Sequence, residues 1–259
     1  MSILLEICCG DIESVGAAIS GGAGRIELCG ALEAGGITPS AGLIEQAIWK
    51  TRLQENILPV NVLVRPRSGD FLYTDRELRQ CAQDTASAVG AGADGIVFGA
   101  LTSDGDIDEY ACAMILETIH KVSESGRKVT TTFHRAFDLC REPFDALEKI
   151  ISLGFDRILT SGQAASAEEG KELLKNLHAR ADDRIIIMPG AGVTPQNILG
   201  IIKDTGVSEI HASAKQHVSS RMRFRREGIG MGTGDEDEYS RYTTSSSIVK
   251  ELSDIIATI

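Results

Sequence analysis

The sequence predicts a single-domain α/β protein, a (β/α)₈ TIM barrel that spans residues 1–259. Eight short, β-rich apolar runs alternate with eight longer amphipathic segments, as a ring of parallel strands surrounded by helices requires. Tight helix-to-strand turns are expected at Gly22–Arg25 and Gly92–Gly95, and a looser one at Gly154–Arg157. The rival fold is a doubly wound open sheet, but its GxGxxG turn is missing after the first strand, which ends in Cys8–Asp11.

The strands are predicted from apolar runs bounded by turn residues, and the helices from a period of 3.6 residues. Pro143 suits the first turn of its helix, where a backbone N–H is not needed. The predicted strands are Leu4–Cys8, Arg25–Cys29, Val60–Arg65, Gly95–Ala100, Lys128–His134, Arg157–Ser161, Arg184–Met188 and Glu209–Ala212. The predicted helices are Ile12–Ser20, Ser40–Thr51, Thr74–Val89, Asp108–Ser123, Pro143–Leu153, Ser166–Ala179, Pro195–Thr205 and Ser247–Ile256.

A long loop over residues 216–246, after the eighth strand, interrupts this regular pattern. It contains a basic run, Arg221–Arg226, and then a glycine-rich, acidic run, Gly228–Glu238. Loops of this length inside a domain are usually functional or disordered. Because the loop leaves the carboxyl end of a strand, we expect it over the barrel mouth, as a mobile surface loop, a lid or a subunit contact.

Composition restricts the class of protein. Hydrophobic residues make up 42% of the chain and charged residues 24%, which suits a soluble domain with a large core. The net charge of −11 disfavours nucleic-acid binding. No apolar run approaches the ~20 residues that cross a bilayer, and the first residues lack a signal-peptide pattern. Six cysteines without paired spacing therefore predict reduced thiols in a cytoplasmic protein, not disulfides or structural zinc.

Two cysteines stand at the ends of neighbouring predicted strands. Side chains alternate along a strand, so Glu6 shares a face with Cys8, and Glu27 shares a face with Cys29. A barrel places its active site at this end of its strands, and adjacent strands lie about 4.8 Å apart. Both thiols are therefore close enough to reach one soft metal ion, such as Cu(I) or zinc. Spacing alone favours the alternative, that small cysteines simply pack well in the interior.

Basic and small residues predict an anion site at the same mouth. Arg65 and Arg67 follow the third strand and suit a carboxylate or phosphate, unless they pair with Glu6 and Glu27 in a structural ion network. Small residues after strands six, seven and eight either let backbone N–H groups approach an anion or simply allow the chain to turn. These turn residues are Ser161, Gly162, Gly190, Gly192 and Ser213.

Two histidines also fall at strand ends. His134 is followed closely by Asp138, a combination that suits general acid–base chemistry, and His211 shares a strand face with Ser213. A single histidine is more often structural, but two beside arginines and carboxylates favour a site. The sixth strand offers no lysine, which argues against a Schiff-base aldolase.

Eight motifs, taken in order, carry a resemblance to a known family. They are Leu5–Cys8, Arg25–Cys29, Gly35–Ser40, Arg65–Phe71, Gly95–Leu101, Thr132–Asp138, Leu159–Gly162 and Met188–Gly192. From residue 3 to about residue 214 the sequence resembles the CutC family of copper homeostasis proteins, whereas residues 216–237 match poorly. The resemblance implies a TIM-type barrel, a cytosolic location and a homo-oligomer, a dimer or a tetramer. It also implies Cu(I) binding by two strand-end cysteines at the positions of Cys8 and Cys29, but it supplies no reaction.

Two compatible functions follow. The first is a copper homeostasis protein that binds Cu(I) through thiols at the barrel mouth. The second is a barrel enzyme that acts on a small anionic or phosphorylated metabolite. There the arginines and turn residues would hold the anion, His134 or Asp138 would move a proton, and Glu6 or Glu27 would assist. A third possibility, an oligomeric scaffold, gives no reason to line a barrel mouth with charge.

Overall fold

The computed structural model describes residues 3–123, 127–226, 228–230 and 238–259. The parallel strands are β1 (Leu4–Cys9), β2 (Arg25–Leu28), β3 (Val60–Leu63), β4 (Gly95–Phe98), β5 (Thr130–Phe133), β6 (Arg157–Thr160), β7 (Ile186–Pro189) and β8 (Glu209–Ala212). The helices are α1 (Ile12–Gly21), α2 (Ala41–Arg52), α3 (Asp75–Ala91), α4 (Glu109–Val122), α5 (Pro143–Leu153), α6 (Lys171–Ala181), α7 (Ile198–Thr205) and α8 (Ser246–Ile256). Two short 3₁₀ helices are η1 (Leu32–Ala34) and η2 (Arg135–Leu139).

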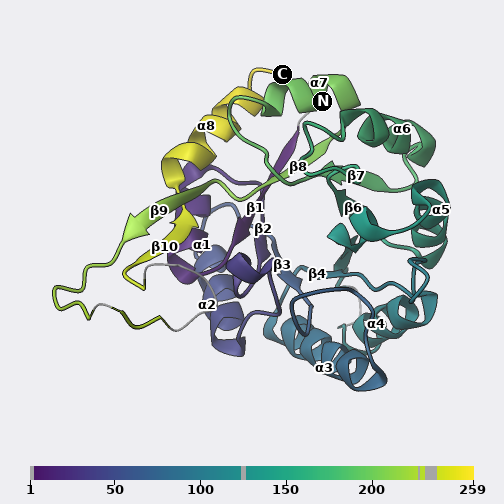
Figure 1. Cartoon of the computed structure of the whole chain (residues 1–259), viewed down its shortest axis with the longest axis horizontal. Coiled ribbons are helices and arrows are strands. Elements are labelled where there is room, and N and C mark those ends of the chain that lie inside the picture. Colours follow the sequence, from purple (N-terminus) through teal and green to yellow (C-terminus); the bar gives the residue numbers. More distant parts are fainter. Residues whose placement is uncertain (1–2, 124–126, 227, 231–237) are drawn as a thin grey trace.

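The eight strands form a ring, and the helices surround it (Figure 1). Parallel hydrogen-bonded ladders join the strands in the order β7-β6-β5-β4-β3-β2-β1-β8, and β8 then lies beside β7. The predicted (β/α)₈ barrel is therefore confirmed. Among the described helices, none has both the length and the apolar character needed to cross a bilayer.

Local signals fix where the helices begin and end. Thr74 and Glu77 form a reciprocal capping box at the start of α3, which satisfies backbone N–H groups that the helix leaves free. Gly22 and Gly92 end α1 and α3 with φ of 84° and 106°, a left-handed conformation that glycine adopts without strain. The tight turns predicted before β2 and β4 are therefore present. The sixth helix begins at Lys171, later than predicted, because turn structure precedes Gly170.

Alternation along the strands divides the interior into two regions. Outward-facing residues such as Ile7 and Ile26 pack under the helices in the main apolar core. Inside the ring, Cys8 and Cys29 form a small separate cluster with two apolar side chains from β3 and β4. Charged residues occupy much of the remaining barrel interior, which is unusual because such interiors are normally filled by branched apolar residues.

The prediction that residues 216–246 form one long loop is wrong at both ends of this segment, where the structure has strands. Strands β9 (Lys215–Ser219) and β10 (Ser240–Thr244) pair antiparallel and form an arm beside α1 that projects from the barrel (Figure 1). Each strand satisfies the backbone groups of the other, so the polar sequence still supports a hairpin. Residue 227, between the predicted basic and acidic runs, and residues 231–237, within the acidic run, lie outside the described residues.

Candidate metal site at the barrel mouth

Two reduced thiols meet inside the barrel mouth, the carboxyl ends of the strands. The Sγ atoms of Cys8 and Cys29 lie 3.6 Å apart, and the Sγ of Cys29 is 3.4 Å from Glu27 Oε2. Both cysteines are free and buried. Parallel pairing of β1 with β2 sets Cys8 level with Glu27, so that Cys29, two residues later, extends over Cys8.

His211 extends the site from β8. Its Nδ1 atom is 2.8 Å from Glu6 Oε1, and its Nε2 atom is 3.8 Å from Glu27 Oε2. The side chains form two overlapping groups whose ligand atoms lie within 4.8 Å of one another, Cys8 with Glu27 and Cys29, and Glu6 with Glu27 and His211. Sulfur, imidazole nitrogen and carboxylate oxygen are thus available to one small volume.

Mutual interactions shift the protonation of these groups. The hydrogen bond from Cys29, helped by His211, lowers the pKa of Cys8 to about 5 and raises the pKa of Cys29 well above its ordinary value. Burial raises the pKa of Glu27 to about 8. Burial opposes a charged His211, but the acidic groups around it, Glu27 first, still raise its pKa well above the ordinary value. At neutral pH the site therefore holds a thiolate beside an imidazolium.

An ion network lies below the thiols, toward the amino ends of the strands. Arg25 donates to Glu6 at 2.5 Å and also pairs with Glu209, and Arg157 donates to Glu209 at 3.1 Å. Burial opposes the charge on Glu6, but Arg25 and His211 lower its pKa to about 2. The sequence reasoning did not single out Arg25, Arg157 or Glu209. The alternation rule could have found them, because each stands two residues before an inward-facing residue at its own strand.

The predicted arginines do not pair with Glu6 and Glu27, so that alternative is wrong. Arg65 donates to the carbonyl oxygens of Gly35, Gly36 and Gly69 at 3.0, 2.9 and 2.7 Å. These bonds hold the segment over residues 30–37 against the barrel mouth. Glu6 is instead bound by Arg25, which starts its strand inside the ring, and Glu27 lies beside Cys29 and His211.

Arg67 lies two residues after Arg65 in the chain and holds its own loop in place through hydrogen bonds. Its guanidinium donates to Glu77 at 2.6 Å, to Asp70 at 3.0 Å and to the Leu72 carbonyl at 2.8 Å. The side chain is thereby fixed over the start of α3. Its predicted role in holding an anion stays a prediction.

His134 and Asp138 are built into separate contacts. The Nδ1 atom of His134 accepts the Ala136 N–H at 3.1 Å, and burial lowers the pKa of His134 to about 3. Asp138 accepts from Thr160 Oγ1 at 2.5 Å and from the Ser161 N–H at 3.0 Å, and it pairs with Arg135. Asp138 therefore joins the loops after β5 and β6, and among the described residues it has no hydrogen bond to His134.

The predicted turn residues mostly bind within the protein. Gly162 donates its N–H to Thr160 Oγ1 at 2.9 Å, and Gly190 donates to the Thr160 carbonyl at 3.0 Å. Ser161 Oγ donates to a carbonyl in its own turn. Gly192 has a left-handed φ of 70° and is exposed, while Ser213, just after β8, lines a pocket with residues 10, 31 and 242. Their role as an anion site also stays a prediction.

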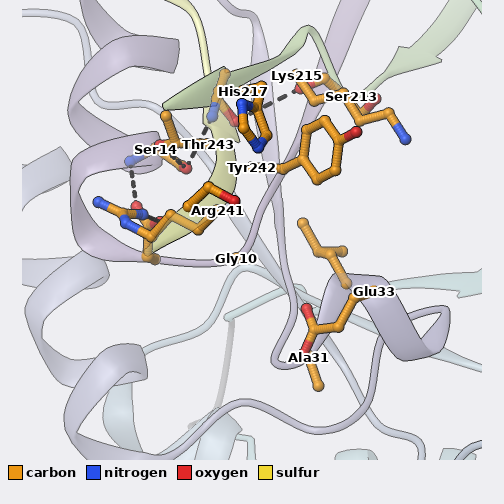
Figure 2. Close-up of a pocket in the computed structure, with 14 residues that line it drawn as sticks. Gly10, Ser14, Ala31, Glu33, Ser213, Lys215, His217, Arg241, Tyr242 and Thr243 are labelled. Atoms are coloured by element: carbon orange, nitrogen blue, oxygen red, sulfur yellow. Dashed lines mark hydrogen bonds and ion pairs between the residues drawn. The ribbon is translucent and has the colours of Figure 1, made fainter. Parts of the chain in front are cut away.

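A pocket of about 1070 Å³ opens beside the thiol pair, between the arm and η1 (Figure 2). Gly10, Ala31 and Ser213 in its wall each stand two residues after Cys8, Cys29 and His211 respectively. Tyr242 and His217 of the arm lie on one side and Glu33 on the other. Thr244 of β10 donates to the Cys8 carbonyl at 3.4 Å, which attaches the arm to the end of β1.

Comparisons with known proteins assign the chain to a family. A family model described as the CutC family matches residues 3–216. This chain belongs to the CutC family. It is 46% identical over 250 residues to a family protein CutC of Vibrio vulnificus strain YJ016, covering 96% of each chain. It is 43% identical over 257 residues to a human copper homeostasis protein cutC homolog, covering 99% of this chain and 90% of the human one.

A solved structure of the same family has the same fold. The putative copper homeostasis protein CutC of Streptococcus agalactiae superposes with a TM-score of 0.74 and 35% identity, over 81% of this chain and 97% of that chain. A distant barrel, KGPDC from Streptococcus mutans, has a TM-score of 0.63 at 10% identity and shows the fold alone.

Proposed function

We propose that this CutC family member binds Cu(I) through Cys8 and Cys29 as its part in copper homeostasis. The observation that carries the proposal is the 3.6 Å separation of two reduced thiols, from different strands, inside the barrel mouth. Relatives at 43 to 44% identity bear the name copper homeostasis protein. Two soft sulfur ligands with an imidazole nearby favour Cu(I) or zinc over magnesium or calcium.

The surroundings of the thiols suit a monovalent cation. Two thiolates and one Cu(I) leave a net negative charge, which the imidazolium of His211 offsets. The low-dielectric interior strengthens that attraction. Glu27, which is 3.4 Å from the Cys29 Sγ, has a pKa of about 8 and keeps its own proton near pH 7, so the proton that Cys29 loses on ligating a metal passes to solvent.

Copper would enter as cargo from the pocket side. Both thiols are buried, and the residues that follow their strands, Gly10 and Ala31, line the pocket beneath the arm. The residue after the His211 strand, Ser213, lines the same pocket. Cargo in this pocket would therefore contact residues that stand two positions after Cys8, Cys29 and His211.

The test is an anaerobic Cu(I) titration against a competing chelator. The Cys8→Ser and Cys29→Ser variants, singly and together, are expected to lose the high-affinity site. The matched control is Cys9→Ser, because Cys9 is equally buried, adjacent in sequence and directed away from the barrel interior, toward the Ile7 carbonyl. Unchanged stoichiometry and affinity in the double variant would overturn the proposal.

We also propose that the protein works as a homo-oligomer in the cytoplasm. Six free cysteines suit a reducing compartment. The connection between β9 and β10 exposes Met222, Phe224 and Ile229, large apolar side chains of the kind that subunit contacts cover. Sedimentation at micromolar concentration is expected to show a dimer or tetramer, and a clean monomer would contradict the oligomer.

A further inference from the structure

Three buried polar atoms without partners gather on the side of the barrel mouth away from the arm. Among the described residues, seven buried side-chain nitrogen or oxygen atoms lack a hydrogen-bond partner. Three of these are Arg65 Nε, Tyr73 Oη and His134 Nε2. All three residues follow strands β3 and β5 at their carboxyl ends and are at least nine-tenths buried. A buried polar group without a partner is costly, so a cluster of them calls for a ligand.

All three atoms are hydrogen-bond donors. The Nδ1 atom of His134 accepts the Ala136 N–H, so the neutral ring carries its proton on Nε2. The guanidinium of Arg65 has only donors. Burial raises the pKa of Tyr73 above its ordinary value, so the phenol keeps its proton. Arg65 Nε and His134 Nε2 can only donate, and the Tyr73 hydroxyl, which lies near Arg65, can donate as well as accept; a set this rich in donors fits an oxygen-rich anion.

One aromatic ring ties the donors together. The centroid of the Phe71 ring is 4.8 Å from the Arg65 Cζ atom and 4.9 Å from the centroid of the His134 ring. Phe71 belongs to the same loop as Tyr73, and the Tyr73 ring packs 6.2 Å from Phe98, which in turn contacts His134. The loop over residues 66–74 therefore covers the donors, with a half-buried Phe71 at its centre.

We propose that Arg65, Tyr73 and His134 form a binding site for the carboxylate group of a small organic acid. The three side chains carry one formal positive charge between them, which matches a monoanion and leaves a phosphate dianion with uncompensated buried charge. The flat Phe71 ring gives the rest of the ligand an apolar surface.

The site is distinct from the proposed Cu(I) ligands. None of its three residues donates to a thiol, Glu6, Glu27 or His211 among the described residues. Arg65 does contact the 30–37 segment that covers Cys29, so a bound acid would share one residue with the cover of the thiols. Loss of copper binding in the cysteine variants and loss of acid binding in the variants below are therefore separate outcomes.

The experiment is a titration of the full chain, without copper, with formate, acetate and succinate, compared with inorganic phosphate and with chloride at equal ionic strength. Calorimetry measures the affinity, and the melting temperature follows occupancy. Tyr73→Phe removes only the hydroxyl. His134→Asn keeps an acceptor for the Ala136 N–H and removes Nε2. Tyr110→Phe, on the exposed face of α4, is the matched control.

At least one organic acid is expected to raise the melting temperature of the unchanged protein. Its affinity is expected to fall about tenfold or more in Tyr73→Phe and in His134→Asn, and to stay the same in Tyr110→Phe. Without ligand, Tyr73→Phe is expected to be as stable as the parent or more so, because it removes an unpartnered buried hydroxyl.

Four results would overturn the proposal. One is the absence of binding by any of the acids, and another is equal affinity in the parent and the two site variants. A preference for phosphate over every carboxylate would replace the proposed monoanion by a different ligand class. A marked loss of stability in unliganded Tyr73→Phe would show that the hydroxyl is satisfied within the protein, which removes the basis of the argument.

Discussion

Gly36 packs directly over Cys29. A Cβ atom built on Gly36 would lie 3.8 Å from the Cys29 Sγ atom and 2.9 Å from Leu63 Cδ2, and the Gly36 carbonyl accepts from Arg65. The segment over residues 30–37 thus forms the cover of the thiol pair, and Arg65 clamps that cover. The thiols owe their burial to this segment as well as to the strands.

The cover requires glycine at position 36. Its φ of 82° is left-handed, and a side chain there would crowd Leu63, so Gly36→Ala is expected to lower the free energy of unfolding by about 1–3 kcal/mol. Gly42→Ala is the control, because Gly42 lies in α2 with nothing within 4 Å of its added Cβ. Urea unfolding should show no loss, or a gain of up to ~1 kcal/mol, in Gly42→Ala. Equal stability of the two variants would contradict the close contact.

Removing the clamp should expose the thiols. Arg65→Ala deletes three hydrogen bonds from a charged group to the Gly35, Gly36 and Gly69 carbonyls. Alkylation of Cys8 and Cys29 by iodoacetamide, followed by peptide mass spectrometry, is expected to accelerate roughly tenfold or more. In the control Arg67→Ala, whose guanidinium has no bond to the cover, the rate should change little. Similar rates in both variants would mean that Arg65 does not hold the cover.

Cu(I) binding should release about one proton near pH 7. Cys8, with a pKa of about 5, is already ionised, whereas Cys29 has a raised pKa and must lose its proton to ligate. Affinity is therefore expected to rise about tenfold per pH unit between roughly pH 6 and 8. Calorimetry in buffers with different ionisation enthalpies measures the proton count. A pH-independent affinity would show that Cys29 is not a ligand.

The buried Glu6–Arg25 pair should make the protein sensitive to acid. The pKa of Glu6 is lowered from 4.5 to about 2 in the folded state, so its stabilising effect is complete above about pH 5 and disappears as pH falls toward 2. Glu6→Gln is expected to flatten stability against pH in this window. It should also cost about 3–5 kcal/mol at pH 7, because Arg25 loses a charged partner in the interior. Urea unfolding between pH 3 and 7 tests both effects.

The exposed Glu172 on α6 supplies the control for that series. Glu172→Gln should leave the stability profile of the parent unchanged between pH 3 and 7. If Glu6→Gln follows the same profile as Glu172→Gln, the pair does not contribute to acid sensitivity.

The fold followed from local pattern alone. Period-2 apolar runs, amphipathic helices and the turns at Gly22 and Gly92 each depend on residues close in sequence, and the barrel they predict is the one observed. The hairpin β9–β10 was missed because its strands are mostly exposed and polar. Its pairing joins Lys215–Ser219 to a segment more than twenty residues later, which no short window detects.

At the candidate site, the sequence pattern predicts which side chains face inward but not which of them pair. Alternation along the strands predicts that four side chains face inward: Glu6, Cys8, Glu27 and Cys29. Because the strands are parallel, their carboxyl ends lie at the same mouth of the barrel. The offset between neighbouring strands along the barrel axis decides which charged side chains come into contact. Glu6 is level with Arg25 and with His211, whereas Arg65 stands higher and reaches the cover instead.

The sequence by itself thus determined the eightfold barrel, the inward faces of its strands and the presence of two thiols at adjacent strand ends. Only the tertiary structure decided the 3.6 Å thiol contact, the Arg25 and Arg157 ion network, the glycine cover and the unpartnered donors. The physical reason is the distance along the chain over which each property is determined. Face and period are set by neighbouring peptide units, but partners, burial and pKa depend on strand offset and loop packing between residues far apart in the chain.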